Sequence, residues 1–127
     1  MTKSASEFYR EEFLRCWPWL EAAMKFYGPT HSKEQIWEEI AAGRAQLWPM
    51  KNAVNLTTIT THPSGLKDAH AWLAGGDLKE IQTWEPLMCK WAKENEGCHR
   101  SIIVGRRGWL KALEGYKELV TTYAKEL

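Results

Sequence analysis

The chain has 127 residues, of which 44% are hydrophobic and 26% are charged, a balance typical of a folded globular domain. Its 17 basic and 16 acidic side chains give a net charge of +1, which gives no overall electrostatic reason to expect nucleic acid as a partner. No apolar run is long enough for a membrane span, and the acidic stretch 1–13 lacks the apolar core of a secretion signal. We therefore expect a protein that is neither embedded in a membrane nor exported by a signal peptide. The length fits one domain, residues 1–127.

Apolar residues recur at helical spacing in an N-terminal segment, residues 1–29. Pro18 interrupts the pattern, so we expect either one bent helix or two helices, with Pro18 in the first turn of the second. Gly28-Pro29 ends the segment. The residues of the predicted apolar face, spaced by three or four positions, are Tyr9, Phe13, Trp17, Leu20, Met24 and Tyr27.

A second helix and three strands are predicted next. Ser32 and Gln35 form a capping box, and the helix that they begin ends at Gly43. After this helix apolar and polar residues alternate with a period of two. This pattern predicts strands at 44–49, 53–61 and 68–74, joined by short turn-rich connections. These strands should form an antiparallel meander.

A long helix begins after the sequence WLAGGD, where Asp77 and Glu80 repeat the capping arrangement with carboxylates. We expect Pro86 to bend this helix and Gly97 to end it. Its predicted apolar face consists of Leu78, Ile81, Trp84, Met88 and Trp91. The remaining chain predicts a fourth strand at 99–104, a short helix at 109–113 and a fifth strand at 118–123.

The predicted fold class is α+β, with a mixed, mostly antiparallel sheet of about five strands flanked by helices and a helical N-terminus. This element order, together with IIVGRRGWLKALEGYKELVTTYAKEL, resembles the second half of the GNAT superfamily of acyl-CoA N-acyltransferases. Gly115-Tyr116 stands where that family has a Gly-aromatic turn. The resemblance implies a GNAT-like core over residues 30–127 that lacks the usual first strand, so one sheet edge is left open or is completed by another chain.

The resemblance also implies where a cofactor would bind. The family holds the CoA pyrophosphate on backbone amides between a strand and the following helix. In this chain the corresponding candidates are Ala74, Gly75 and Gly76, with Arg106 and Arg107 from a neighbouring loop. The turn is shorter than the family motif, and Asp77 would place a carboxylate on the same amides, so we expect no cofactor, or acetyl-CoA if the chain is an enzyme.

Catalytic residues are sparse. The family commonly has a tyrosine acid four positions before the Gly-aromatic turn, where this chain has Lys111. A base could be water or His70 on the third strand, and a structural role in the strand is the competing interpretation of His70. The three cysteines have no ligand-like spacing, so no metal site or disulfide framework is predicted.

Eight tryptophans are numerous for this length. Trp37, Trp84 and Trp91 lie on predicted helical stripes and are expected in the core. An aromatic ring with one polar atom suits a protein interface, and the interface candidates, at element ends or beside Pro18, are Trp17, Trp19, Trp48, Trp72 and Trp109.

The chain further resembles small GNAT-like proteins encoded beside virion genes in tailed phages, through the stretches GRAQLWP, WLAGGDL and GRRGW. This implies a non-catalytic phage protein, in the virion or the host cytoplasm, that acts as a virion component or assembly factor. Its partners would be other phage structural proteins or further copies of itself. The alternative is an acetyl-CoA-dependent N-acetyltransferase with a shortened cofactor loop.

Overall fold

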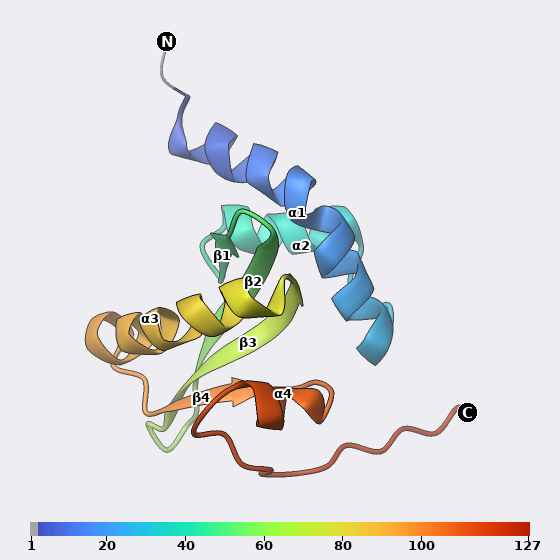
Figure 1. Cartoon of the computed structure of the whole chain (residues 1–127), viewed down its shortest axis with the longest axis vertical. Helices are drawn as coiled ribbons and strands as arrows, with labels where there is room; N and C mark the ends of the chain where they lie inside the picture. Colours follow the sequence, from blue (N-terminus) through green and yellow to red (C-terminus); the bar gives the residue numbers. More distant parts are fainter. Residues whose placement is uncertain (1–2) are drawn as a thin grey trace.

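The computed structural model describes residues 3–127, which form an α+β fold with one mixed sheet flanked by helices (Figure 1). None of the helices in these residues is both long and apolar enough to span a membrane. In chain order the elements are α1 (Ala5–Tyr27), α2 (Lys33–Ala41), β1 (Ala45–Pro49), β2 (Ala53–Thr61), β3 (Lys67–Gly76), α3 (Leu78–Glu96), β4 (Arg100–Ile103) and α4 (Gly108–Ala112).

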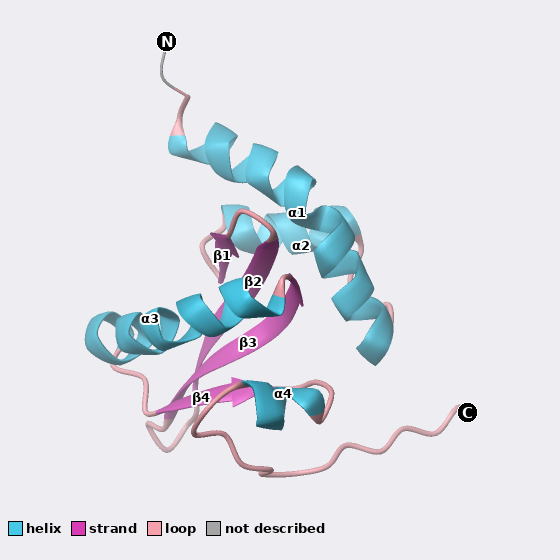
Figure 2. Ribbon diagram, in the orientation of Figure 1, coloured by secondary structure: helices cyan, strands magenta, loops and turns pink. Residues whose placement is uncertain are grey.

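The strands lie in the order β1-β2-β3-β4. The first three form the predicted antiparallel meander, and β4 pairs with β3 in parallel. A parallel neighbour needs a crossover connection, which α3 provides. Strands β1 and β4 are therefore the two edges of the sheet (Figure 2).

The first helix is one continuous element, so Pro18 does not divide it in two. Pro18 is exposed, and the helix changes direction along its length (Figure 1). A proline on the outer side of a helix removes a hydrogen bond there and permits such a bend. Tyr9 and Tyr27, at the ends of the predicted apolar face, are exposed.

One face of the sheet packs against α1 and α2. The capping box that begins α2 is confirmed, since Ser32 Oγ accepts from Gln35 N and Gln35 Oε1 accepts from Ser32 N. Helix and strand residues form one buried apolar cluster on this side, made of Phe13, Cys16, Leu20, Met24, Ile36, Ala45, Leu47, Val54, Leu56 and Leu73.

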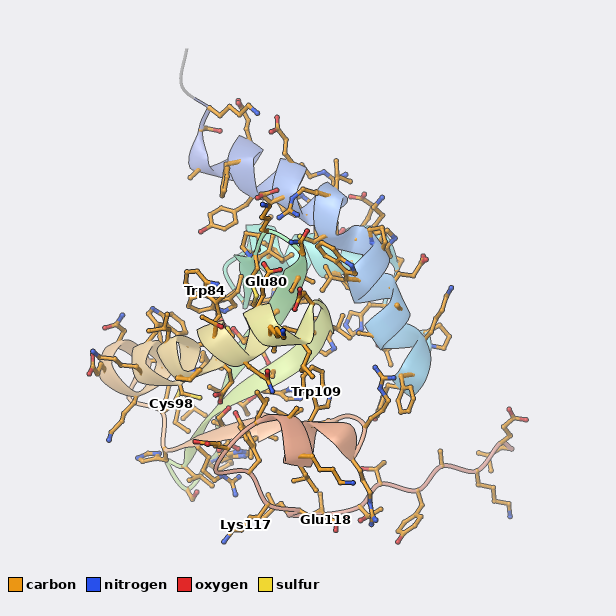
Figure 3. All side chains as sticks on the ribbon, viewed as in Figure 1. Glu80, Trp84, Cys98, Trp109, Lys117 and Glu118 are labelled. Atoms are coloured by element: carbon orange, nitrogen blue, oxygen red, sulfur yellow. The ribbon has the colours of Figure 1, made fainter. Side chains whose placement is uncertain are left out.

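The opposite face carries α3 and a smaller buried cluster of Met50, Ala53, Ile81 and Met88. The prediction that Trp84 belongs to the core is wrong, because its exposed fraction is 45% and it stands at the surface of α3 (Figure 3). The inward stripe of α3 runs instead through Ile81, Met88 and Ala92. Trp84 is at the margin of that stripe. Pro86 lies inside α3, which remains one helix.

The predicted fifth strand at 118–123 is also wrong, because residues 116–127 form neither helix nor strand. The segment runs in an extended course to the C-terminus (Figure 1). A strand requires a neighbour for its backbone hydrogen bonds, and alternating β-forming residues do not supply one. The observed sheet therefore has four strands within residues 3–127.

Candidate functional site

The two glycines before α3 belong to the sheet. Strand β3 continues beyond the predicted end at Ala74, and Gly75 and Gly76 lie opposite Val54 and Ala53 of β2. Just beyond the strand, the backbone N–H of Asp77 donates to the carbonyl of Asn52 at 2.8 Å. The junction is thus a paired strand end rather than an open loop.

Close packing explains why glycine is needed at both positions. A Cβ on Gly75 would lie 2.9 Å from the carbonyl oxygen of Trp19 in α1. A Cβ on Gly76 would lie 2.4 Å from the carbonyl oxygen of Asn52, and Gly76 has a φ of +102°, which side-chain-bearing residues rarely adopt. The glycines allow the backbone of Trp19 and Asn52 to lie close to the strand, in space that a phosphate-binding loop would need to keep free.

The N-terminus of α3 is capped by Asp77, as the sequence predicts, but Glu80 does not complete the predicted capping box. Asp77 Oδ1 accepts hydrogen bonds from the backbone N–H groups of Lys79 at 2.8 Å and Glu80 at 3.4 Å. The side chain of Glu80 turns to the β1–β2 connection and accepts from the backbone N–H of Asn52 at 3.0 Å. The Asp77 carboxylate therefore occupies the helix amides where an anion would bind, and the Glu80 carboxylate lies beside the β1–β2 connection.

The candidate arginines lie in the loop before α4. The guanidinium of Arg106 stands over the ring of Phe26 at 5.0 Å, and Arg107 Nη2 lies 3.6 Å from Glu118 Oε1 at the surface. Of the five cofactor candidates, Ala74 and Arg106 line one common cavity, whereas Gly75, Gly76 and Arg107 do not line it. The structure thus brings together only part of the predicted group.

This cavity, of about 90 Å³, lies between the sheet and α3. It exists because β3 presents three small side chains to α3, those of Ala69, Ala71 and Ala74. Trp109 of α4 and Leu113 just after it close it from that side, and Figure 3 shows the Trp109 side chain extending from α4 toward α3. The volume can hold several water molecules or a small apolar group.

A polar cluster lines the cavity and was not predicted. Tyr116 Oη donates to Glu85 Oε1 at 2.7 Å, and the hydroxyl of Ser101 lies 2.6 Å from Tyr116 Oη. Cys89 Sγ also donates to Glu85 Oε1, at 2.9 Å. These four residues come from α3, β4 and the segment after α4. The spacing of Glu85 and Cys89, one helical turn apart, is the only sign of the cluster in the sequence.

Burial raises the pKa of both donors. Desolvation is the largest cause for Tyr116 and for Cys89, and the hydrogen bond to Glu85 raises each pKa further. Both groups therefore carry their protons at neutral pH. The cluster presents a neutral phenol and a neutral thiol around one carboxylate, an arrangement suited to donating hydrogen bonds rather than to nucleophilic attack.

His70 is separate from this cluster. On β3 it points to the side opposite Ala69 and Ala71, as alternation along a strand requires, and it does not line the cavity. Its Nε2 is buried and has no hydrogen-bond partner among residues 3–127, and burial lowers the pKa of the imidazole. The structure places the candidate base away from the tyrosine hydroxyl.

An ion pair lies on the same side of β3 as His70. Arg100 donates to both oxygens of Asp68, at 2.8 and 2.9 Å, and His62 Nε2 lies 2.8 Å from Asp68 Oδ2. The hydrogen bonds from Arg100 hold the pKa of the buried Asp68 carboxyl well below its usual range. These residues join β4 and the β2–β3 turn to β3, which is a structural role.

All five tryptophans predicted to lie at an interface, Trp17, Trp19, Trp48, Trp72 and Trp109, are half-buried. Trp48 donates from Nε1 to Thr57 Oγ1 at 2.9 Å, and its ring packs edge-on against Trp91 at 5.1 Å. Trp72 packs in the same way against His31 at 4.7 Å. Each ring therefore has partners within the chain and keeps part of its surface accessible.

The three cysteines are free thiols, and residues 3–127 contain no group of three or more side chains positioned to hold a metal ion. No family model, curated protein or solved structure matches this chain. Any functional assignment therefore depends on the junction, the cavity and the surface of the protein itself.

Proposed function

We propose that this chain is a non-catalytic, GNAT-like protein that acts through protein–protein contacts, as a virion component or assembly factor of a tailed phage. The closed β3–α3 junction is the observation that carries the non-catalytic part. The amides of Asp77, Lys79 and Glu80 already have partners in the chain, so a pyrophosphate would have to displace Asp77.

The arrangement of elements supports the GNAT-like part of the proposal. Two helices, an antiparallel meander and a parallel β4 reached through α3 follow the order that the resemblance implies. The lack of a strand after α4 is a departure from that order. The phage setting, in the virion or the host cytoplasm, is supported by the sequence resemblance alone.

Exposed apolar side chains support a role in protein contacts. They include Phe8, Leu14, Phe26 and Tyr27 of α1 and Trp84 and Leu87 of α3, with exposed fractions from 42% to 67%. Large apolar surfaces favour association because contact removes them from water. The C-terminal segment adds further exposed apolar residues, Leu119, Val120 and Tyr123.

A second candidate, the acetyl-CoA-dependent N-acetyltransferase, is favoured by one observation. The cavity between β3, β4 and α3 holds the hydroxyl of Tyr116, which is protonated and could supply a proton to a departing thiolate. This hydroxyl is the acid that the sequence pattern lacks at Lys111.

Calorimetric titration with CoA and acetyl-CoA separates the two candidates. We expect no heat at millimolar ligand from the wild type or from Asp77→Asn, because asparagine can keep the same cap and the other junction amides stay paired. Micromolar binding by the wild type would contradict the non-catalytic proposal. If acetyl transfer were then detected, Tyr116→Phe should lower kcat by about 100-fold or more.

The virion part of the proposal has its own measurement. Mass spectrometry of purified particles of a phage that encodes this chain should find it at a fixed copy number per particle. Its presence only in the lysate, and never in particles or assembly intermediates, would count against both the virion and the assembly role.

A further inference from the structure

Strand β1 is a free edge of the sheet. Its backbone pairs with β2 on one side, and among residues 3–127 no other backbone hydrogen bonds to Ala45–Pro49. Pro49 closes the strand, which suits an edge because proline has no N–H to contribute to a further neighbour. Outward backbone groups of β1 are therefore available to an added strand.

An open apolar hollow of about 320 Å³ follows this edge. Tyr9 of α1 and Ile40 of α2 border it from one face of the sheet, and Trp91 of α3 borders it from the other. Residues of β1, including Leu47 and Trp48, complete its lining. A strand laid beside β1 would consequently meet apolar side chains on both of its faces.

The C-terminal segment has the composition of such a strand. Leu119, Val120 and Tyr123 have exposed fractions of 60%, 77% and 88%, so the described chain leaves most of each side chain uncovered. In an extended strand Leu119 and Tyr123 project to one side and Val120 to the other. A segment with apolar residues on both sides fits a groove with apolar walls on both sides.

We propose that residues 118–123 of a second copy of this chain add as a strand to the β1 edge. The chain's own segment leaves the fold at the opposite edge, since the Tyr116 hydroxyl is held by Ser101 of β4. Figure 3 accordingly shows Lys117 and Glu118 on the far side of α4 from β1. Reciprocal exchange between two copies gives a closed dimer, and one-way exchange gives a longer assembly.

This inference rests on the proposed role in protein–protein contacts and names the partner as a second copy. Strand addition supplies backbone hydrogen bonds for β1, and burial of Leu119, Val120 and Tyr123 supplies apolar contact. The length of the segment, six residues, is close to the five residues of β1.

Light scattering coupled to size-exclusion chromatography tests the inference on the full-length chain. We expect the wild type to show at least twice the monomer mass at high concentration, and L119K/V120K to stay monomeric. Tyr9→Arg, in the groove wall, should weaken association by about tenfold or more. The matched controls are Val104→Lys near β4 and Tyr27→Arg on the same helix as Tyr9, and neither should change the mass.

Nuclear magnetic resonance then locates the contact. The backbone amides of Ala45 and Leu47, which the register with β2 turns toward the free edge, should shift with concentration in the wild type and stay fixed in L119K/V120K. A wild type that is monomeric at high concentration, a mass unaffected by L119K/V120K, or shifts confined to β4 would each overturn the inference. Failure of the proposed function is a separate result, because it appears as CoA binding in calorimetry whatever the oligomeric state.

Discussion

The two faces of the sheet are filled differently. On the α1 and α2 face, Phe13, Leu20 and Ile36 are completely buried in one continuous apolar cluster. On the α3 face, the buried cluster has four members, and beside it lie a cavity of about 90 Å³ and the polar group around Glu85. The comparison indicates that the first face holds most of the folding free energy, whereas the second leaves room and polar groups for a ligand.

Substitution of a large residue on each face gives the largest expected difference. Leu20→Ala should lower the free energy of unfolding by about 3 kcal/mol, because it opens a cavity in a closely packed cluster. Met88→Ala should cost less, about 2 kcal/mol, because Met88 already borders a cavity and lacks contacts on that side. Urea unfolding measures both losses of unfolding free energy. A loss for Met88→Ala that equals or exceeds that for Leu20→Ala would contradict the expected difference between the faces.

The close approach of α1 to the sheet gives the next effect. Gly75→Ala should destabilise the protein by about 2 kcal/mol, since the new Cβ would force the backbone of Trp19 away from β3. Gly108→Ala is the matched control, because a Cβ at that position meets no atom of residues 3–127 within 4 Å. Thermal unfolding of both variants is the measurement. If Gly75→Ala left the stability unchanged, the α1 and α2 face would be packed more loosely than its buried residues indicate.

Local sequence signals predicted most of this fold. The spacing of Phe13, Leu20 and Met24 defines the buried side of α1, and Ser32 and Asp77 mark helix starts that their hydrogen bonds confirm. These signals succeed because the interactions behind them lie within one or two turns of the same helix.

Features that depend on distant neighbours were not predictable. Ser101 and Tyr116 reach Glu85 through the parallel pairing of β4 with β3, which joins distant parts of the chain. No local spacing in the sequence therefore reveals this group. The opposite error occurred at 118–123, where residues suited to a strand have no partner in the described chain. The prediction that Trp84 lies in the core was wrong because periodicity gives the width of a helical stripe only approximately.

Substitution in the Asp68–Arg100 ion pair tests whether polar contacts on the α1 and α2 face also stabilise the fold. Asp68→Asn should cost about 1 to 2 kcal/mol at neutral pH, because it removes a charged acceptor from Arg100, whose side chain is partly exposed. The measurement is urea unfolding at neutral pH, with Glu126→Gln on the exposed C-terminal segment as the control. No loss in Asp68→Asn would mean that the pair adds nothing to the first face.

The same variant has an expected pH dependence. The Asp68 carboxyl has a lower pKa in the folded protein than in the unfolded chain, whose usual value is about 3.9, so its contribution is complete above that pH. As the pH falls below about 4, the unfolded chain binds the proton first and the wild type loses stability. The difference between wild type and Asp68→Asn should therefore shrink between neutral pH and the acid range. A constant difference would show that the charge of Asp68 is not its source.

Tyr116→Phe gives the smallest effect and examines the second face. It removes one hydrogen bond to Glu85 and one to Ser101 from a half-buried site, so we expect a loss of about 1 kcal/mol, against no change for the exposed Tyr123→Phe. Because the folded state holds the Tyr116 proton more tightly than the unfolded chain does, wild-type stability should fall as the pH rises above about 10. Tyr116→Phe should show a shallower fall. If its profile instead follows that of the wild type, the phenol is not a buried member of the cluster, and the second face would be distinguished by its cavity alone.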